Sequence, residues 1–302
     1  DEVEVSFFQL NPFATLSITK QWHPKFKRLV ALPCELKTFL EHDAFIDFGS
    51  LILRESMNTK PMVDFFLEGF SIDPETVPVE RKRIKYQISK QAQEYVGEIF
   101  KKIRAKTNRR IVMLHHGSTT SMRSMPDRVA RRVVREIIEE TNAYVITAKF
   151  LEFYDPNFLD ISRYSMDFDH FAAIISNVDA LITVDTSAYH LADAFDIPTG
   201  VIFTTIDPEL RVKYYPHVKA LSLNEGKFAG RHSHSKDEQI MKQEVSEIET
   251  LWEKLDTKDI LNLVYRHSKV CGWKLTSNFK TRGSDVRSQA YSGKCEGEQP
   301  TN

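Results

Sequence analysis

The stretch from residue 178 to residue 203, VDALITVDTSAYHLADAFDIPTGVIF, decides the fold of this chain. Its apolar run at residues 180–184 predicts a buried parallel strand, because both faces of that strand are hydrophobic. A helix is expected directly after it, over residues 187–195, and a second buried strand follows at residues 199–203. Strand, helix and strand in this order form a βαβ unit, which is typical of α/β proteins with a parallel sheet.

The junction between the first strand and the helix, Asp185-Thr186-Ser187, is a candidate anion site. Thr186 or Ser187 is a natural N-cap, so the unbonded N–H groups of the first helical turn point out of the carboxyl end of the strand. These groups, the positive end of the helix dipole and the hydroxyls beside them favour a phosphate. Helix capping alone is the alternative explanation for these residues. It leaves His190, one turn into the helix, unexplained, although a lone helical histidine is more often structural.

A second polar loop precedes a helix that opens at Asp127. Residues 110–114 are predicted to form a strand, and residues 115–126, HHGSTTSMRSMP, follow it. Gly117 allows close approach of the backbone to a ligand, and Arg123 has a planar guanidinium whose N–H groups match the oxygens of a phosphate. The loop is neither a Walker loop nor a dinucleotide-binding loop, and a plain polar loop is the alternative. Two such loops at the carboxyl ends of neighbouring parallel strands are where open α/β sheets bind ligands.

These residues resemble glycosyltransferase family 9, whose best-known members are the ADP-heptose:lipopolysaccharide heptosyltransferases of the GT-B fold. The family's hydroxyl-rich loop, followed by Lys-x-aromatic-Pro, is similar to residues 118–126. Its Asp-Thr-Gly-x-x-His-Leu string is similar to residues 185–191, DTSAYHL. The resemblance covers residues 105–222 with good spacing and residues 20–85 more loosely. It implies a GT-B-like α/β fold with two Rossmann-like domains and parallel sheets, the first domain being incomplete.

The resemblance also implies a set of donor-binding residues. A hydroxyl pair would hold the pyrophosphate, an arginine would supply the charge that the family takes from lysine, and the Asp-Thr-x-x-x-His string would surround the diphosphate and the sugar. A glutamate would bind the ribose, and a methionine would contact the base. The residues concerned are Ser118, Thr119, Arg123, Glu152, Met166, Asp185, Thr186, Ser187 and His190.

Two departures from the family pattern bear on that site. Ser187 occupies the position where the family has glycine, and its side chain narrows the space through which the sugar would approach. Residues 204–208, TTIDP, replace a Gly-Pro-Thr-x-Pro loop, so the family's contact at that loop does not carry over.

The catalytic base is not identified by the sequence. In the family it is an aspartate on a glycine-containing loop after the first strand, and the chain shows no such opening. Strands are expected at residues 3–10 and 28–33, and residues 43–48 resemble a further strand of the family, so the chain is expected to enter the first domain partway through. His23 and Asp47 are the weak candidates for the catalytic group.

Length and composition predict two domains and exclude a general nucleic-acid binder. The chain has 302 residues and a formal net charge of −1, whereas a basic excess is expected of a protein that binds nucleic acid. Three cysteines, scattered at positions 34, 271 and 295, suggest neither a disulfide framework nor a zinc site. No apolar run is long enough to span a membrane. We expect a cytoplasmic protein, with peripheral attachment to the inner face of a membrane as an alternative.

The organisation along the chain follows from these elements. We expect a partial, acceptor-side α/β domain (residues 1–85), a linking helix (86–106), a nucleotide-sugar-binding α/β domain (107–225), carboxyl-terminal helices that pack back on the first domain (226–275) and a flexible tail (276–302). Further helices are predicted at residues 35–41, 60–70, 127–141, 168–177, 207–214, 237–255 and 257–267, and further strands at 143–147 and 218–222.

Two features suggest a metal site, and each has a simpler explanation. His232 and His234 could bind a metal, but they lie in a polar segment that is expected to be a flexible loop. Asp167-Phe168-Asp169 matches the Asp-x-Asp pattern of metal-dependent glycosyltransferases, yet it precedes a helix, where aspartate is an ordinary cap. Positive groups around the diphosphate would neutralise it without a metal, so no metal and no cofactor are expected.

The sequence therefore predicts an inverting, metal-independent GT-B glycosyltransferase. Its donor would be a nucleotide diphosphate sugar, of which ADP-linked heptose is the expected example, and its acceptor a glycan or a lipid-linked saccharide. The tail could serve an oligomer or a partner chain. The alternative is a non-catalytic GT-B-like module that acts as a scaffold or a subunit of a larger assembly, which the absence of an identified base favours.

Overall fold

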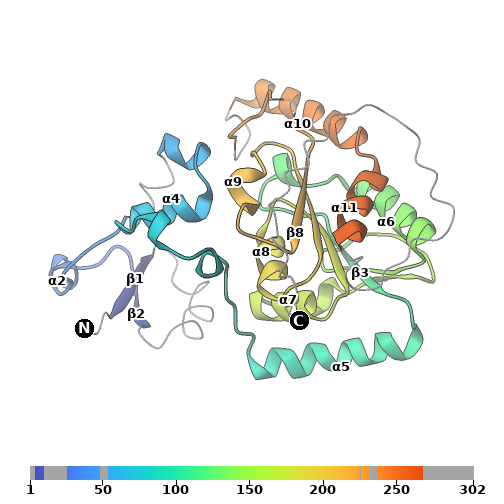
Figure 1. Ribbon diagram of the computed structural model, residues 1–302, viewed down its shortest axis with the longest axis horizontal. Helices are drawn as coiled ribbons and strands as arrows, with labels where there is room; N and C mark the ends of the chain where they lie inside the picture. Colours follow the sequence, from blue (N-terminus) through green and yellow to red (C-terminus); the bar gives the residue numbers. More distant parts are fainter. Residues whose placement is uncertain are drawn as a thin grey trace, which may run out of the picture.

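The computed structural model describes residues 4–9, 26–47, 54–224, 226–231, 235 and 237–267. Figure 1 shows two groups of elements: a smaller one with β1, β2, α2 and α4, and a larger one built around a single sheet. Among the described residues, no helix combines the length and the apolar character that crossing a membrane requires. His23, His232, His234, Cys271, Cys295 and the predicted tail at 276–302 lie outside the described residues.

The larger group contains a six-stranded parallel sheet in the order β5-β4-β3-β6-β7-β8. β3 lies at its centre, and the chain builds outward from β3 first on one side and then on the other. The carboxyl ends of β3 and β6 therefore flank the point where the strand order reverses, which is where open α/β sheets bind ligands. The strands are β3 (Ile111–His115), β4 (Tyr144–Thr147), β5 (Phe158–Asp160), β6 (Ala180–Val184), β7 (Thr199–Phe203) and β8 (Val218–Ser222).

Helices cover both faces of this sheet, which explains why β6 and β7 are buried along their whole lengths. One face packs against α5 (Lys90–Lys106), α7 (Phe168–Ser176) and α8 (Ser187–Ala194). The other packs against α6 (Asp127–Thr141) and the carboxyl-terminal helices α10 (Glu238–Glu253) and α11 (Thr257–His267). The alternation of strand and helix confirms the predicted α/β class. The predicted elements of this domain agree with the observed bounds to within four residues, and β5 was not predicted.

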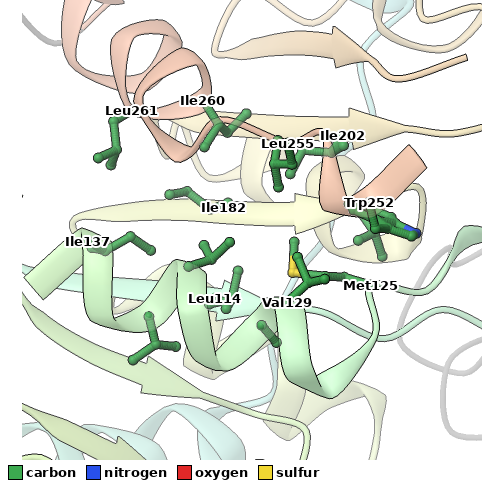
Figure 2. Close-up of a cluster of buried hydrophobic side chains, with 14 of the residues drawn as sticks. Leu114, Met125, Val129, Ile137, Ile182, Ile202, Trp252, Leu255, Ile260 and Leu261 are labelled. Atoms are coloured by element: carbon green, nitrogen blue, oxygen red, sulfur yellow. The ribbon is translucent and has the colours of Figure 1, made fainter. Parts of the chain in front are cut away.

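The carboxyl-terminal helices pack closely on the second domain. Figure 2 shows Trp252, Leu255, Ile260 and Leu261 facing the sheet beside Ile202, within the same hydrophobic cluster as α6. The expected return of this segment to the first domain stays a prediction. A helix with an apolar stripe packs where the largest apolar surface is available, and here that surface is the face of β6 and β7.

The smaller group is an α/β arrangement with a two-stranded parallel sheet. β1 (Val5–Gln9) pairs with β2 (Phe26–Ala31), close to the two strands expected there. The strand predicted at residues 43–48 is wrong: residues 43–47 pair with no strand in the described part of the chain, and Ile46 is 40% exposed. Among the described residues of this group, the helices are α2 (Leu36–Leu40), η1 (Glu55–Asn58), α4 (Met62–Gly69), η2 (Pro74–Thr76) and η3 (Val79–Arg81).

A buried ion pair joins the two groups. Lys82, after η3, donates to Asp64 Oδ1 of α4 at 2.8 Å and lies 3.1 Å from the hydroxyl of Tyr214 in the second domain. The Tyr214 hydroxyl donates to the other oxygen of Asp64 at 2.6 Å. Asp64 and Lys82 are both more than 90% buried. This three-residue contact, called the Asp64–Lys82–Tyr214 junction below, fixes the first domain to the segment that follows β7.

Candidate functional site

The two loops predicted to bind a phosphate lie side by side. β3 and β6 pair in parallel, with His115 opposite Thr183, so the residues that follow each strand emerge together. The hydroxyl of Ser118 donates to the carbonyl of Asp185 at 2.9 Å and joins the two loops directly. The structure thus brings both sequence motifs to one edge of the sheet.

The loop after β3 is held in shape by its own hydrogen bonds. The N–H of Ser118 donates to Ser124 Oγ at 2.9 Å, and that hydroxyl donates to the carbonyl of Thr120 at 2.9 Å. The loop also contacts the segment after β7, because the hydroxyl of Thr204 donates to the carbonyl of Met122 at 2.8 Å. A loop fixed in this way binds a ligand at a lower entropic cost than a mobile one.

Arg123, in η4 (Ser121–Arg123), spans the two loops. Its Nη1 lies 3.2 Å from Asp185 Oδ2, and its Nη2 donates to Thr119 Oγ1 at 2.8 Å. The other carboxylate oxygen of Asp185 accepts from the hydroxyl of Tyr189 at 3.4 Å. Arg123 is therefore positioned by groups that leave part of its guanidinium facing the edge of the sheet, with its side chain 18% exposed.

The amino terminus of α8 provides uncapped N–H groups at the same edge. Thr186 is the N-cap residue, as predicted, with an extended backbone, but its side chain makes no capping hydrogen bond. Ser187 is exposed beside it. The first-turn N–H groups and the positive end of the helix dipole are therefore open to an anion.

His190 lies one turn into α8 and is electrically neutral. Its Nδ1 is 2.8 Å from the hydroxyl of Tyr215, and its ring packs against Tyr189 with the two ring centroids 4.0 Å apart. Burial and, secondarily, the nearby charge of Arg211 lower the pKa of His190 to about 3. His190 therefore contributes hydrogen bonding rather than charge, and the partner Tyr215 was not anticipated from the sequence.

Lys149, after β4, is a cation that the sequence reading missed. Its side chain crosses Gly117 so closely that a Cβ at Gly117 would lie 2.4 Å from Lys149 Cδ. Burial and, to a smaller extent, this ammonium lower the pKa of His115 to about 3 and that of His116 to about 4. A lysine directly after a parallel strand was the available signal, but nothing in the sequence showed that it would reach the neighbouring loop.

The remaining predicted donor residues lie toward the β4 and β5 side of the sheet. Glu152 is exposed in the loop after β4, and Met166, after η5 (Ser162–Tyr164), is 58% exposed. Phe150, two residues before Glu152 in that loop, is 69% exposed. Their predicted contacts with a ribose and a base stay predictions.

The two aspartates of the Asp-x-Asp pattern stabilise helix starts, as the capping explanation predicts. Asp167 is the N-cap of α7 and accepts from the N–H of His170 at 2.8 Å. Asp169 accepts from the N–H of Ser89 and the hydroxyl of Tyr86, both at 3.0 Å, and so holds the start of α5. Within the described part of the chain, no three His, Cys, Asp or Glu side chains gather as metal ligands would.

The catalytic group is not assigned by the structure. Asp47 was expected in an apolar strand, but it is exposed and lies outside any strand. His23 falls outside the described residues. Neither candidate gains support, and the site in the second domain consists of cations, hydroxyls and one neutral histidine around Asp185.

Comparisons with known proteins connect this site to a family. Residues 164–241, which contain β6, α8 and β7, match the family model described as glycosyltransferase family 9 (heptosyltransferase). A search of curated proteins found no match.

Two solved structures resemble the chain over most of its length. ADP-heptose lps heptosyltransferase II of E. coli has a TM-score of 0.50 and 11% sequence identity, over 83% of this chain and 90% of that one. A glycosyl transferase family 9 protein from Veillonella parvula DSM 2008 has the same TM-score and identity, over 83% of this chain and 89% of that one. At this identity the likeness shows the fold, which is of the GT-B type.

Proposed function

We propose that this chain, which matches glycosyltransferase family 9 through residues 164–241 and has a GT-B-like fold, binds a nucleotide diphosphate sugar and transfers the sugar to an acceptor. The family match and the shared fold support a glycosyltransferase. The observation that carries the donor site is the convergence of Ser118, Arg123, Asp185 and the uncapped start of α8 at the point where the strand order reverses.

This arrangement suits a departing diphosphate. Direct displacement at the anomeric carbon inverts the sugar and leaves two negative charges on the terminal phosphate of the leaving group. Arg123 and the α8 amino terminus would stabilise those charges as they develop, and preorganised donors are most effective when they need not move during the reaction. The acceptor hydroxyl needs a general base, which we place in the first domain without naming the residue.

ADP-linked heptose is the proposed donor, and a glycan or lipid-linked saccharide the proposed acceptor. The family description and the name of the E. coli heptosyltransferase support this choice. We further propose that the reaction is independent of a metal, because the site gathers positive charge of its own and Asp167 and Asp169 are already engaged by backbone N–H groups.

Calorimetric titration with ADP, UDP and GDP in the presence of EDTA tests this proposal. We expect ADP to bind most tightly and Arg123→Ala to weaken its binding by about 1.5–3 kcal/mol, roughly 10- to 150-fold, which is the contribution of a charge-assisted hydrogen bond. Arg135→Ala, which removes an exposed arginine from the middle of α6, is the matched control and should leave the affinity unchanged.

Three outcomes would contradict parts of the proposal. Binding of none of the three nucleotides by the parent protein would favour the non-catalytic module. Tighter binding of UDP or GDP than of ADP would mean that the donor carries uracil or guanine in place of adenine. A requirement for Mg²⁺ or Mn²⁺ would overturn metal independence.

A further inference from the structure

Arg211 is a buried arginine whose charge the rest of the described chain does not neutralise. It lies in α9 (Glu209–Val212), after β7, and is 6% exposed. Its Nη1 donates to the carbonyl of Leu210 at 3.2 Å, whereas its Nη2 is buried without a hydrogen-bond partner. Among the described residues, no carboxylate lies within ion-pair distance of it. A buried guanidinium in this state is costly, so a folded protein that retains one has a use for it.

The surroundings of Arg211 are those of the donor site. The carboxylate of Asp185 and the guanidinium of Arg123 are close enough to act on the charge of Arg211, Tyr189 is a further neighbour, and the charge of Arg211 acts on His190. The segment that leads to it is attached to the phosphate loop through the Thr204 hydroxyl. Arg211 therefore reaches the same edge of the sheet from a third loop, which the sequence reading did not include.

Around Asp185, positive charge exceeds negative charge among the described residues. Arg123 and Arg211 face a single carboxylate, Asp185, which already accepts from Arg123 and Tyr189. Lys149 lies over the loop after β3, where Asp127 and Asp160 act on His116 with the opposite charge, so it is not counted in this excess. An anionic ligand would restore neutrality there, and a phosphate group of a diphosphate has the required charge.

The order of the strands shows which part of that ligand Arg211 would meet. Along the edge of the sheet the loops follow the order β4, β3, β6 and β7. The exposed Glu152 and Met166, proposed for the ribose and the base, lie toward β4 and β5, and Ser118 follows β3. The loop after β7 lies at the opposite end of this series, on the side where the terminal phosphate and the sugar would be.

We propose that Arg211 binds the phosphate distal to the nucleoside, as a second guanidinium beside Arg123. This inference rests on the proposed function and extends it to a residue outside the family motifs. It also assigns a role to the loop at 204–212, which departs in sequence from the corresponding loop of the family.

Comparing ADP with AMP isolates the distal phosphate. Calorimetry on the full chain should show that Arg211→Gln weakens ADP binding by 10- to 100-fold and changes AMP binding by less than 3-fold. Arg211→Lys keeps the charge but loses the planar set of N–H donors. Its affinity for ADP should fall between those of the parent and of Arg211→Gln. Arg135→Ala should match the parent for both nucleotides.

A stability measurement separates ligand binding from a structural role. Because Arg211 has no neutralising partner, Arg211→Met should melt at the same temperature as the parent or above it, while losing ADP affinity like Arg211→Gln. A residue kept for structure would instead lower the melting temperature when it is replaced.

The outcomes distinguish this inference from the function on which it rests. If Arg123→Ala weakens ADP binding and neither Arg211→Gln nor Arg211→Met does, the role of Arg211 is wrong and the donor site stands. If Arg211→Gln weakened the binding of ADP and of AMP equally, Arg211 would not bind the phosphate distal to the nucleoside. If the parent binds neither nucleotide, the proposed function fails and the inference fails with it.

Discussion

Three histidines are held neutral by burial, and they make the stability of the protein sensitive to acid. Burial is the main cause that lowers the pKa of His115 and His190 to about 3 and that of His116 to about 4, against an ordinary value of 6.5. The unfolded chain therefore binds protons below pH 6.5 that the folded chain does not. The stabilisation is fully present above pH 6.5 and is lost as the pH falls toward the folded-state values.

We expect the free energy of unfolding to fall by about 1.4 kcal/mol per histidine between pH 7.5 and pH 5.5, or ~4 kcal/mol in total. Urea unfolding at pH 7.5, 6.5 and 5.5 measures it. A stability that stays constant or rises on acidification would show that these rings are protonated in the folded protein.

Individual site residues were predictable where a local rule defined them. Thr186 or Ser187 was predicted as the N-cap from its place between a strand and a helix, and the structure has Thr186 there; Arg123 was predicted as a ligand from its place in a polar loop, and this role stays a prediction. Arg211 and Tyr215 could not be found in this way, because their importance depends on how the segment after β7 folds back onto α8. That is a tertiary contact, and short sequence patterns carry no signal for it.

At the scale of elements, the contact of α11 with β7 depends on a glycine. A Cβ at Gly200 would lie 2.7 Å from Ile260 Cδ1 and 2.8 Å from Val264 Cγ2. We expect Gly200→Ala to lower the free energy of unfolding by about 1–3 kcal/mol through overpacking, measured by urea unfolding. Ile260→Val, which removes the Cδ1 atom, should recover part of that loss in the double variant.

Gly97, in the middle of α5, is the matched control for this substitution. A Cβ there would meet no atom within 4 Å. Gly97→Ala should therefore raise the stability by about 0.5–1 kcal/mol, since alanine favours a helix interior. If Gly200→Ala proved as harmless as Gly97→Ala, the close packing of α11 on β7 would be incorrect.

The elements of the second domain were predictable because their hydrophobic patterns are strong. Fully buried strands such as β6 and β7 read as continuous apolar runs, and α6 has a clear apolar stripe. β5, with three residues, is too short to give a pattern and was missed. The pattern at residues 43–48 resembled a strand, but a strand also needs a partner for its backbone, and a local pattern does not show whether one is present.

At the scale of the whole molecule, the two charged residues of the Asp64–Lys82–Tyr214 junction should contribute unequally to stability. Asp64 also lies 3.9 Å from Lys213, so its carboxylate keeps a positive neighbour and the Tyr214 hydroxyl when Lys82 is replaced. Without Asp64, the buried ammonium of Lys82 has no carboxylate within ion-pair distance in the described part of the chain.

We therefore expect Asp64→Leu to lower the free energy of unfolding by about 3–5 kcal/mol, and Lys82→Met by clearly less. The double variant should be more stable than Asp64→Leu alone, because it removes the unpaired charge. Denaturant unfolding of all four proteins completes the double-mutant cycle. Equal and additive losses would mean that the two charges do not interact.

The short segment from Arg211 to Tyr215 has a mechanical consequence. The Tyr214 hydroxyl donates to Asp64 of the first domain, Tyr215 contacts His190, and Arg211 is buried. These five consecutive residues of the second domain therefore connect the contact with Asp64 to the side chains beside α8. We expect a rotation of the first domain that moves Asp64 to displace this segment and the guanidinium of Arg211, which would couple the domain proposed to hold the acceptor to the site proposed to hold the donor.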